Sequence, residues 1–82
     1  MAKLPPPPPL AMPVPGVTRN QIKQAVGDLL MASAARIGRE LNFIGPGAIG
    51  LIYHALEDMT AAGELEKTWI NNQFLFSVRN EP

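Results

Sequence analysis

Residues 33–78 read SAARIGRELNFIGPGAIGLIYHALEDMTAAGELEKTWINNQFLFSV, and most of the signals for secondary structure in the chain lie in this segment. Ser33 is a good helix N-cap, and Ile37 and Leu41 follow at helical spacing, so a helix is expected over residues 34–41. Asn42 suits the end of this helix because asparagine tolerates a left-handed backbone. With the elements that follow, the stretch predicts a mainly helical domain with a small β-hairpin, which is an α+β fold class.

A longer helix is expected after the turn at residues 43–47. Pro46 suits its first turn, because the amide hydrogen that proline lacks would be unpaired there. Gly63 suits the position just past its end. Apolar residues recur with helical spacing within residues 46–62. We therefore expect one buried stripe, with Tyr53 beside it, made of Ile49, Ile52, Leu56 and Met59.

Two strands are expected over residues 65–70 and 73–78, which are rich in aromatic and β-branched side chains. Asn71 and Asn72 join them, and asparagine accepts the positive φ that a type I′ hairpin turn requires. An isolated hairpin is only marginally stable in water, so we expect this one to pack against the helices.

Side chains of the hairpin alternate between its two faces. Phe74, Phe76 and Val78 fall on one face, which we expect to meet the core. Trp69 is interpreted either as a cover of the core or as a partly exposed anchor. Because tryptophan is highly buried on average, the core position is favoured.

A further helix is expected before this stretch, over residues 18–31. Thr18, with Gln21 three residues later, fits a capping box. The apolar residues that then recur at helical spacing are Ile22, Val26, Leu29 and Leu30.

The chain divides into a proline-rich arm at residues 1–16 and a folded domain at residues 17–80. The unbroken proline run at residues 5–9 predicts an extended polyproline II rod. Two interpretations of the arm remain open, a semi-rigid spacer and a ligand for an aromatic groove. The apolar residues that would contact a partner, or fold back onto the domain, are Leu4, Leu10, Met12 and Val14.

Length and composition exclude several classes of protein. The 82 residues correspond to one domain. No apolar run approaches the roughly 18 to 20 residues of a membrane span, so no membrane association is expected. The first residues lack the proline-free apolar stretch of a secretory leader. The chain has no cysteine, which is compatible with a reducing compartment, and we expect a cytoplasmic protein.

No catalytic or metal-binding constellation is evident. One histidine and no cysteine do not build a usual transition-metal site, so no metal and no cofactor are expected. Nothing places His54 near Ser33 or Ser77, and the neighbouring Glu57 and Asp58 point in different directions on a helix. We therefore expect neither an enzyme nor a small-molecule substrate.

Residues 52–67, IYHALEDMTAAGELEK, carry a recognisable spacing. An apolar residue is followed by others four and seven positions later, by glycine eleven positions later, and then by a strand. Together with SAARIGREL at residues 33–41, this pattern resembles the winged helix-turn-helix DNA-binding domains of bacteria and phages. The resemblance covers more than half of the chain. It implies three helices with a two-stranded wing, and transcription regulation through duplex DNA.

The chain departs from that family pattern in two places. The turn between Leu41 and Ile52 is longer than the family usually has, so either the loop is extended or the following helix begins early. Residues 46–62 contain no Lys or Arg. Because arginine to guanine is the commonest specific base contact, phosphate contacts are expected to outweigh base contacts here.

Charge is unevenly spread along the chain. Residues 1–44 carry five basic and two acidic residues, and residues 45–82 carry two and five, so these parts have net charges of +3 and −3. Such a chain can present a basic side to DNA. The candidate phosphate contacts are Arg19, Lys23, Arg36, Arg39, Lys67 and Arg79, with the amides of Gly47 and Ala48 at a helix N-terminus. The candidate base or groove contacts are Tyr53, His54, Asn71 and Asn72.

The same residues also suit ordinary roles, as solvated charges, a half-buried ring and turn formers. The neutral net charge and the proline-rich arm favour an alternative, a winged-helix module that binds a protein partner and no DNA. Its contact surface would be Leu51, Tyr53 and Trp69. On the DNA-binding interpretation, specific repression requires either a homodimer or a protein partner, because a basic patch alone binds weakly.

Overall fold

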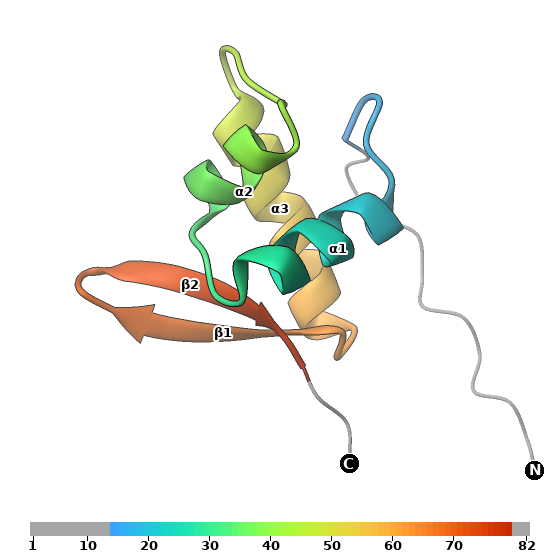
Figure 1. Cartoon of the computed structure of the whole chain (residues 1–82). Coiled ribbons are helices and arrows are strands. Elements are labelled where there is room, and N and C mark those ends of the chain that lie inside the picture. The colour runs from blue at the N-terminus through green and yellow to red at the C-terminus, as the bar shows by residue number, and fades with distance from the viewer. Residues whose placement is uncertain (1–13, 80–82) are drawn as a thin grey trace, which may run out of the picture.

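Three helices precede an antiparallel β-hairpin in the computed structural model, which describes residues 14–79 (Figure 1). The elements are α1 (Arg19–Leu29), α2 (Ala34–Glu40), α3 (Ala48–Ala61), β1 (Leu65–Ile70) and β2 (Gln73–Val78). This arrangement confirms the expected α+β fold class, and it is winged-helix-like. Most of the proline-rich arm, with Leu4, Leu10 and Met12, and the end of the chain at residues 80–82 lie outside the described residues.

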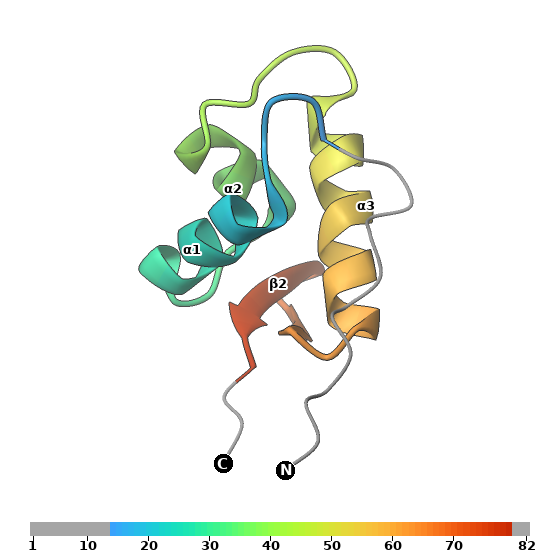
Figure 2. The same ribbon diagram turned by 90° about the vertical axis from the view of Figure 1, so that its right-hand side faces the viewer.

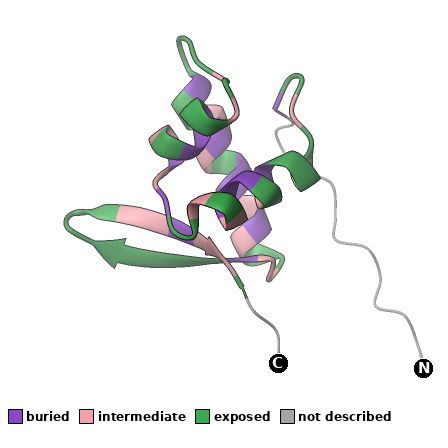
Figure 3. Ribbon diagram, in the orientation of Figure 1, coloured by how far each residue is buried: buried purple, intermediate pink, exposed green. Residues whose placement is uncertain are grey.

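The core lies where the three helices meet the base of the hairpin. Figure 2 shows α3 standing beside α1 and α2, with β2 crossing below, and in Figure 3 the buried residues gather on the inward sides. Val14, at the start of the described chain, also belongs to this core. The largest fully buried side chains are Phe76, Ile22, Ile37, Ile52, Leu56, Met59, Leu65 and Val26.

Side-chain caps fix where α1 and α2 begin, and both are confirmed. The Thr18 hydroxyl accepts from the Gln21 amide at 3.2 Å, and the Gln21 side-chain oxygen accepts from the Thr18 amide at 2.8 Å, which completes the capping box. The Ser33 hydroxyl accepts from the Arg36 amide at 3.3 Å. Each cap satisfies amides that the first turn leaves without a helical partner.

Left-handed residues end α2 and α3. Asn42 has φ 56° and Gly63 has φ 86°, as the sequence predicts for both. After α3 the Gly63 amide donates to the Thr60 carbonyl, and the Glu64 amide donates to the Met59 carbonyl, each at 3.0 Å. This pair of bonds is a Schellman motif, which turns the chain sharply into β1.

The start of α3 differs from the expected one. The Ala48 amide donates to the Gly45 carbonyl at 3.1 Å, and Gly47 has φ 78° and ψ −4°. Residues 45–48 therefore form a type II turn, with Pro46 at its second position. The prediction that Pro46 lies in the first helical turn is wrong, because the left-handed Gly47 separates it from the helix.

The buried stripe of α3 also begins at a different residue. Ile52, Leu56 and Met59 are fully buried, but the side chain of Ile49 is 58% exposed. Ala48 takes the inward position instead, because it is four residues before Ile52 and therefore lies on the same face. The predicted burial of Ile49 is wrong by one position around the helix.

The hairpin has the predicted strand bounds and turn. Asn71 and Asn72 have φ 52° and 62°, the positive values that a type I′ turn needs. Phe76 is fully buried, and its amide and carbonyl also exchange hydrogen bonds with those of Ala32, at 2.8 and 3.0 Å. The base of the hairpin is thus held from the side by the segment between α1 and α2.

Trp69 lies on the inward face of the hairpin but not in the core. It pairs with Phe74 across the strands and is 58% exposed, so the favoured core position is wrong. The hairpin extends past the helices (Figure 1), and its outer half has no helix above it. The two rings pack edge to face with centroids 4.7 Å apart, which makes Trp69 the partly exposed alternative.

Leu30 ends α1 in a strained backbone conformation. It has φ 67° and ψ −57°, and the Met31 amide donates to the Leu29 carbonyl at 2.8 Å across it. This is the γ-turn with positive φ, which is rare for residues other than glycine. The helix therefore ends at Leu29, earlier than the apolar spacing predicts, and the Leu30 side chain is 79% exposed.

Leu30→Gly is expected to stabilise the domain. Residues in such conformations cost about 1–3 kcal/mol, whereas the extra backbone entropy of glycine costs only about 0.5–1 kcal/mol. The expected gain of roughly 1 kcal/mol raises the melting temperature of a domain this size by about 4–8 °C, measurable by circular dichroism. Met31→Gly is the control, because Met31 has no positive φ and should lose stability. A lower melting temperature for Leu30→Gly than for wild type would mean that the backbone of Leu30 is not strained.

Candidate nucleic-acid interface

Two arginines stand on the outer side of α2, the helix before α3 in the helix-turn-helix. Arg36 and Arg39 are both exposed, and neither forms an ion pair with any residue of the described part of the chain. They are three positions apart, so they lie on neighbouring positions of the helix surface. Arg39 also adds a cation in the last turn of α2, where the helix dipole favours positive charge.

Other candidate phosphate contacts are engaged with carboxylates. The Arg19 Nε lies 2.6 Å from Glu64 Oε2, and the Lys23 Nζ lies 4.0 Å from Glu64 Oε1. The Lys67 Nζ lies 2.8 Å from Glu57 Oε1. Cations of α1 thus meet an acid from the acidic half of the chain, which reduces the separation into a basic and an acidic side. Phosphate would have to compete with these carboxylates for the same cations.

Arg79 follows β2, and its amide donates to the Glu64 carbonyl at 3.1 Å. Arg79 is exposed, and its side chain reaches towards the Gly63 corner. It therefore lies at the base of the wing, near the end of α3.

An acid-centred network lies between α3 and β1. The Tyr53 hydroxyl donates to the Glu57 carboxylate, and this bond raises the pKa of Tyr53. The hydrogen bond from Lys67 holds the pKa of Glu57 below its usual range and raises the pKa of Lys67. Lys67 also lies 4.5 Å above the Phe74 ring centroid. The network ties α3 to β1, and it places a carboxylate on the helix expected to face DNA.

The remaining α3 candidates are placed as follows. His54 is exposed, whereas Tyr53 is half-buried and packs its ring edge to face against Phe76, with centroids 5.9 Å apart. Gly47 is the N-cap residue, and Ala48 is 5% exposed. Because the Ala48 amide already bonds the Gly45 carbonyl, it is not free for an anion. The prediction that the Ala48 amide binds an anion is therefore wrong.

The wing tip is exposed at Asn71 and Asn72. The surface expected for a protein partner is not continuous, however. Leu51 and Tyr53 are two positions apart on a helix, so their side chains point in directions about 160° apart. Both pack partly against the core, while Trp69 lies out on the wing against Phe74.

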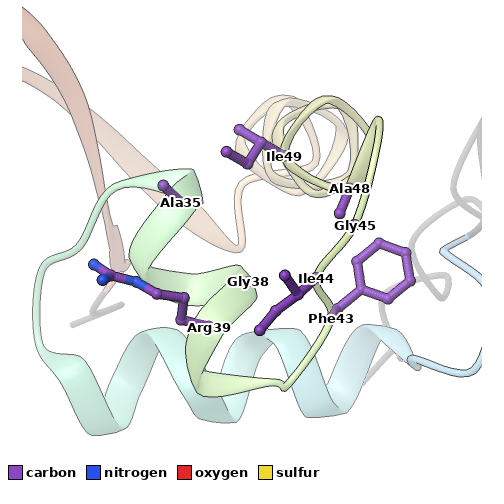
Figure 4. A pocket seen from close by; sticks show the side chains of 8 residues that line it. All are labelled: Ala35, Gly38, Arg39, Phe43, Ile44, Gly45, Ala48 and Ile49. Atoms are coloured by element: carbon purple, nitrogen blue, oxygen red, sulfur yellow. The ribbon is translucent and has the colours of Figure 1, made fainter.

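A cavity that the sequence analysis misses lies between α2 and α3 (Figure 4). It has a volume of about 240 Å³. Its eight lining residues are Ala35, Gly38, Arg39, Phe43, Ile44, Gly45, Ala48 and Ile49. Ile44 is 73% exposed and Ile49 is 58% exposed, so both branched side chains stand at its rim. The run of small residues in the α2–α3 turn is the only sequence signal for it, since glycine and alanine leave space.

No metal or membrane element is found in the described region. Within residues 14–79, no three His, Cys, Asp or Glu side chains are grouped to hold an ion. No helix of this part is both long enough and apolar enough to cross a bilayer.

Comparison with known proteins adds no relative. No family model matches the sequence, and no curated protein or solved structure matches it. The functional argument therefore rests on the geometry of this chain.

Proposed function

We propose that the protein is a small winged-helix DNA-binding protein, a transcriptional regulator of bacterial or phage type that acts in the cytoplasm. The observation that carries the proposal is the pair of unpaired, exposed arginines on α2, within a helix-turn-helix followed by a projecting wing. Guanidinium groups bind phosphate oxygens in bidentate geometry. Arg36 and Arg39 would hold the DNA backbone while His54 and the asparagines of the wing tip reach towards the grooves.

With two unpaired arginines on α2 among the described residues, binding would be weak and its dependence on salt modest. Each neutralised phosphate contributes about −0.9 to the slope of log affinity against log salt concentration. The two α2 arginines would therefore account for a slope of about −2. Specific repression would need a second copy on an adjacent half-site, or a protein partner, to add further contacts.

The test is a fluorescence-anisotropy titration of purified protein with random duplex DNA at about 50 and 200 mM salt, where phosphate contacts show their slope. Arg36→Gln with Arg39→Gln should reduce the slope by about 2 and remove most binding at low salt. Asn20→Glu with Gln24→Glu is the matched control, because it lowers the net charge equally at exposed positions of α1. Absence of wild-type binding at low salt, or equal loss in both double variants, would refute contact through α2.

A second function, a protein-interaction module without DNA binding, is supported by a different observation. Ile44 and Ile49 are exposed at the α2–α3 cavity, on the side where DNA would need polar or basic residues. Exposed branched aliphatic side chains grouped at a hollow are typical of protein contacts. The proline-rich arm, as sequence, is compatible with the same role.

A further inference from the structure

We propose that the cavity between α2 and α3 binds one apolar side chain of an acidic segment of a partner protein, with a carboxylate of that segment paired to Arg39. The proposal rests on the protein-interaction function above and not on DNA binding. It names the site and the chemistry of the partner.

The size of the cavity suits a side chain. Its volume of about 240 Å³ is below the roughly 300–1,000 Å³ of small-molecule sites, so it admits one or two side chains. Its wall is made largely of small residues, among them Ala35, Gly45 and Ala48. Gly38 packs tightly against the α2–α3 turn, since an added Cβ would lie 3.3 Å from the Phe43 carbonyl oxygen. The hollow is therefore framed by tight backbone packing on one side.

The rim supplies an apolar anchor. Ile44 comes from the turn and Ile49 from the first turn of α3, and Figure 4 shows their side chains on either side of the hollow. Both are mostly exposed in this chain. A Leu, Phe or Trp side chain inserted between them would remove apolar surface from water on both residues at once, which is the pattern of an interface hot spot.

Charge selects the kind of partner. Arg39 is the one charged side chain among the described residues that line the cavity, and Arg36 stands one turn earlier on α2. The acids nearest in sequence on α1 and α2, Asp28 and Glu40, line a different hollow on the far side of α2. An approaching segment therefore meets positive charge beside an apolar hollow. A peptide with an apolar residue next to Asp or Glu is complementary to both features.

A polynucleotide matches only one of these features. Its phosphates suit the arginines, but a sugar–phosphate backbone offers no apolar side chain to fill the cavity or cover the isoleucines. A second copy of the chain would have to bring a segment of the same chemistry, and a concentration series separates that case from a foreign partner.

The test is selection of a phage-displayed random 12-residue peptide library on the intact protein. We expect enriched peptides to carry Leu, Phe or Trp within two positions of Asp or Glu. Synthetic copies of them should bind Ile49→Asp and Arg39→Gln at least ten-fold more weakly than wild type. Trp69→Ser is the matched control, since it removes an equally exposed apolar side chain from the wing, and it should bind the peptides unchanged.

Three results would overturn the proposal. One is that no peptides are enriched. Another is that the enriched peptides bind Ile49→Asp and Arg39→Gln as tightly as wild type, or bind Trp69→Ser more weakly. The third is self-association of the wild type, measured by light scattering over a concentration series, that Ile49→Asp abolishes, since the occupant would then be a second copy. The DNA-binding proposal fails in a separate measurement, if the titration with duplex DNA shows no salt-dependent binding. That result would not affect the peptide result.

Discussion

Phe76→Ala is expected to unfold most of the domain. Phe76 is fully buried, it packs against Tyr53, and its backbone is bonded to Ala32 as well as to β1. Truncating a buried phenylalanine costs about 3–5 kcal/mol through lost transfer energy and the cavity left behind. Small domains lie at the low end of the usual stability of about 5–15 kcal/mol, so this loss approaches the whole margin.

The measurement is urea unfolding followed by circular dichroism, with the wild type beside the variant. Phe74→Ala is the matched control, because Phe74 lies on the same face of β2 but is only half-buried. It should cost roughly 1 kcal/mol, about half the value for full burial of such a side chain. Equal losses at the two positions would mean that the hairpin base is not the anchor described above.

Ile52→Ala is expected to cost about 2–5 kcal/mol, whereas Ile49→Ala should stay within about 0.5 kcal/mol of wild type. The two residues are chemically identical and lie on the same helix, but Ile52 is fully buried and Ile49 is 58% exposed. Alanine has the higher helix propensity in both variants, so that small gain cancels in the comparison. The difference between the two losses isolates burial.

The urea midpoints of the two variants give this difference directly, provided that their unfolding free energies depend on urea concentration with the same slope. A large loss of stability for Ile49→Ala would mean that this side chain is buried in the core and fills the α2–α3 cavity. It would also restore the apolar stripe that the spacing of the sequence predicts. A small loss for Ile52→Ala would mean that the packing of α3 against α2 is loose.

Local chemistry made much of the fold predictable. Thr18 with Gln21, and Ser33 alone, fix two helix starts because their oxygens satisfy nearby amides whatever the tertiary fold. Asn71 and Asn72 specify the hairpin turn through their tolerance of positive φ. These signals are short-ranged, and each was read from a few adjacent residues.

The wrong predictions concern the packing of a side chain against the rest of the fold and the choice between two local conformations. Apolar spacing does not separate Ala48 from Ile49 as the first inward residue of α3, because both lie close to the direction of Ile52 and Leu56. The high average burial of tryptophan does not reveal that the hairpin extends past the helices and leaves Trp69 exposed. Pro46 fits a helix start and a type II turn equally well, and Gly47 decides between them.

The candidate site was predictable in part. The exposed arginines of α2 follow from their positions opposite Ile37 and Leu41 on the helix. The bonds from Lys67 to Glu57 and from Arg19 to Glu64 join residues 10 and 45 positions apart, so no local pattern reveals them. The link from Tyr53 to Glu57 has the i, i+4 spacing of helix neighbours, which is a signal that was available and was missed.

The paired bonds between Ala32 and Phe76 give the wing the mechanics of a lever. At the base of the wing, β2 lies between β1 and the segment leading into α2, whereas the tip at Asn71 and Asn72 extends past the helices. Bending of the tip would therefore be resisted at Phe76, whose paired bonds to Ala32 lie one residue before Ser33, the N-cap of α2.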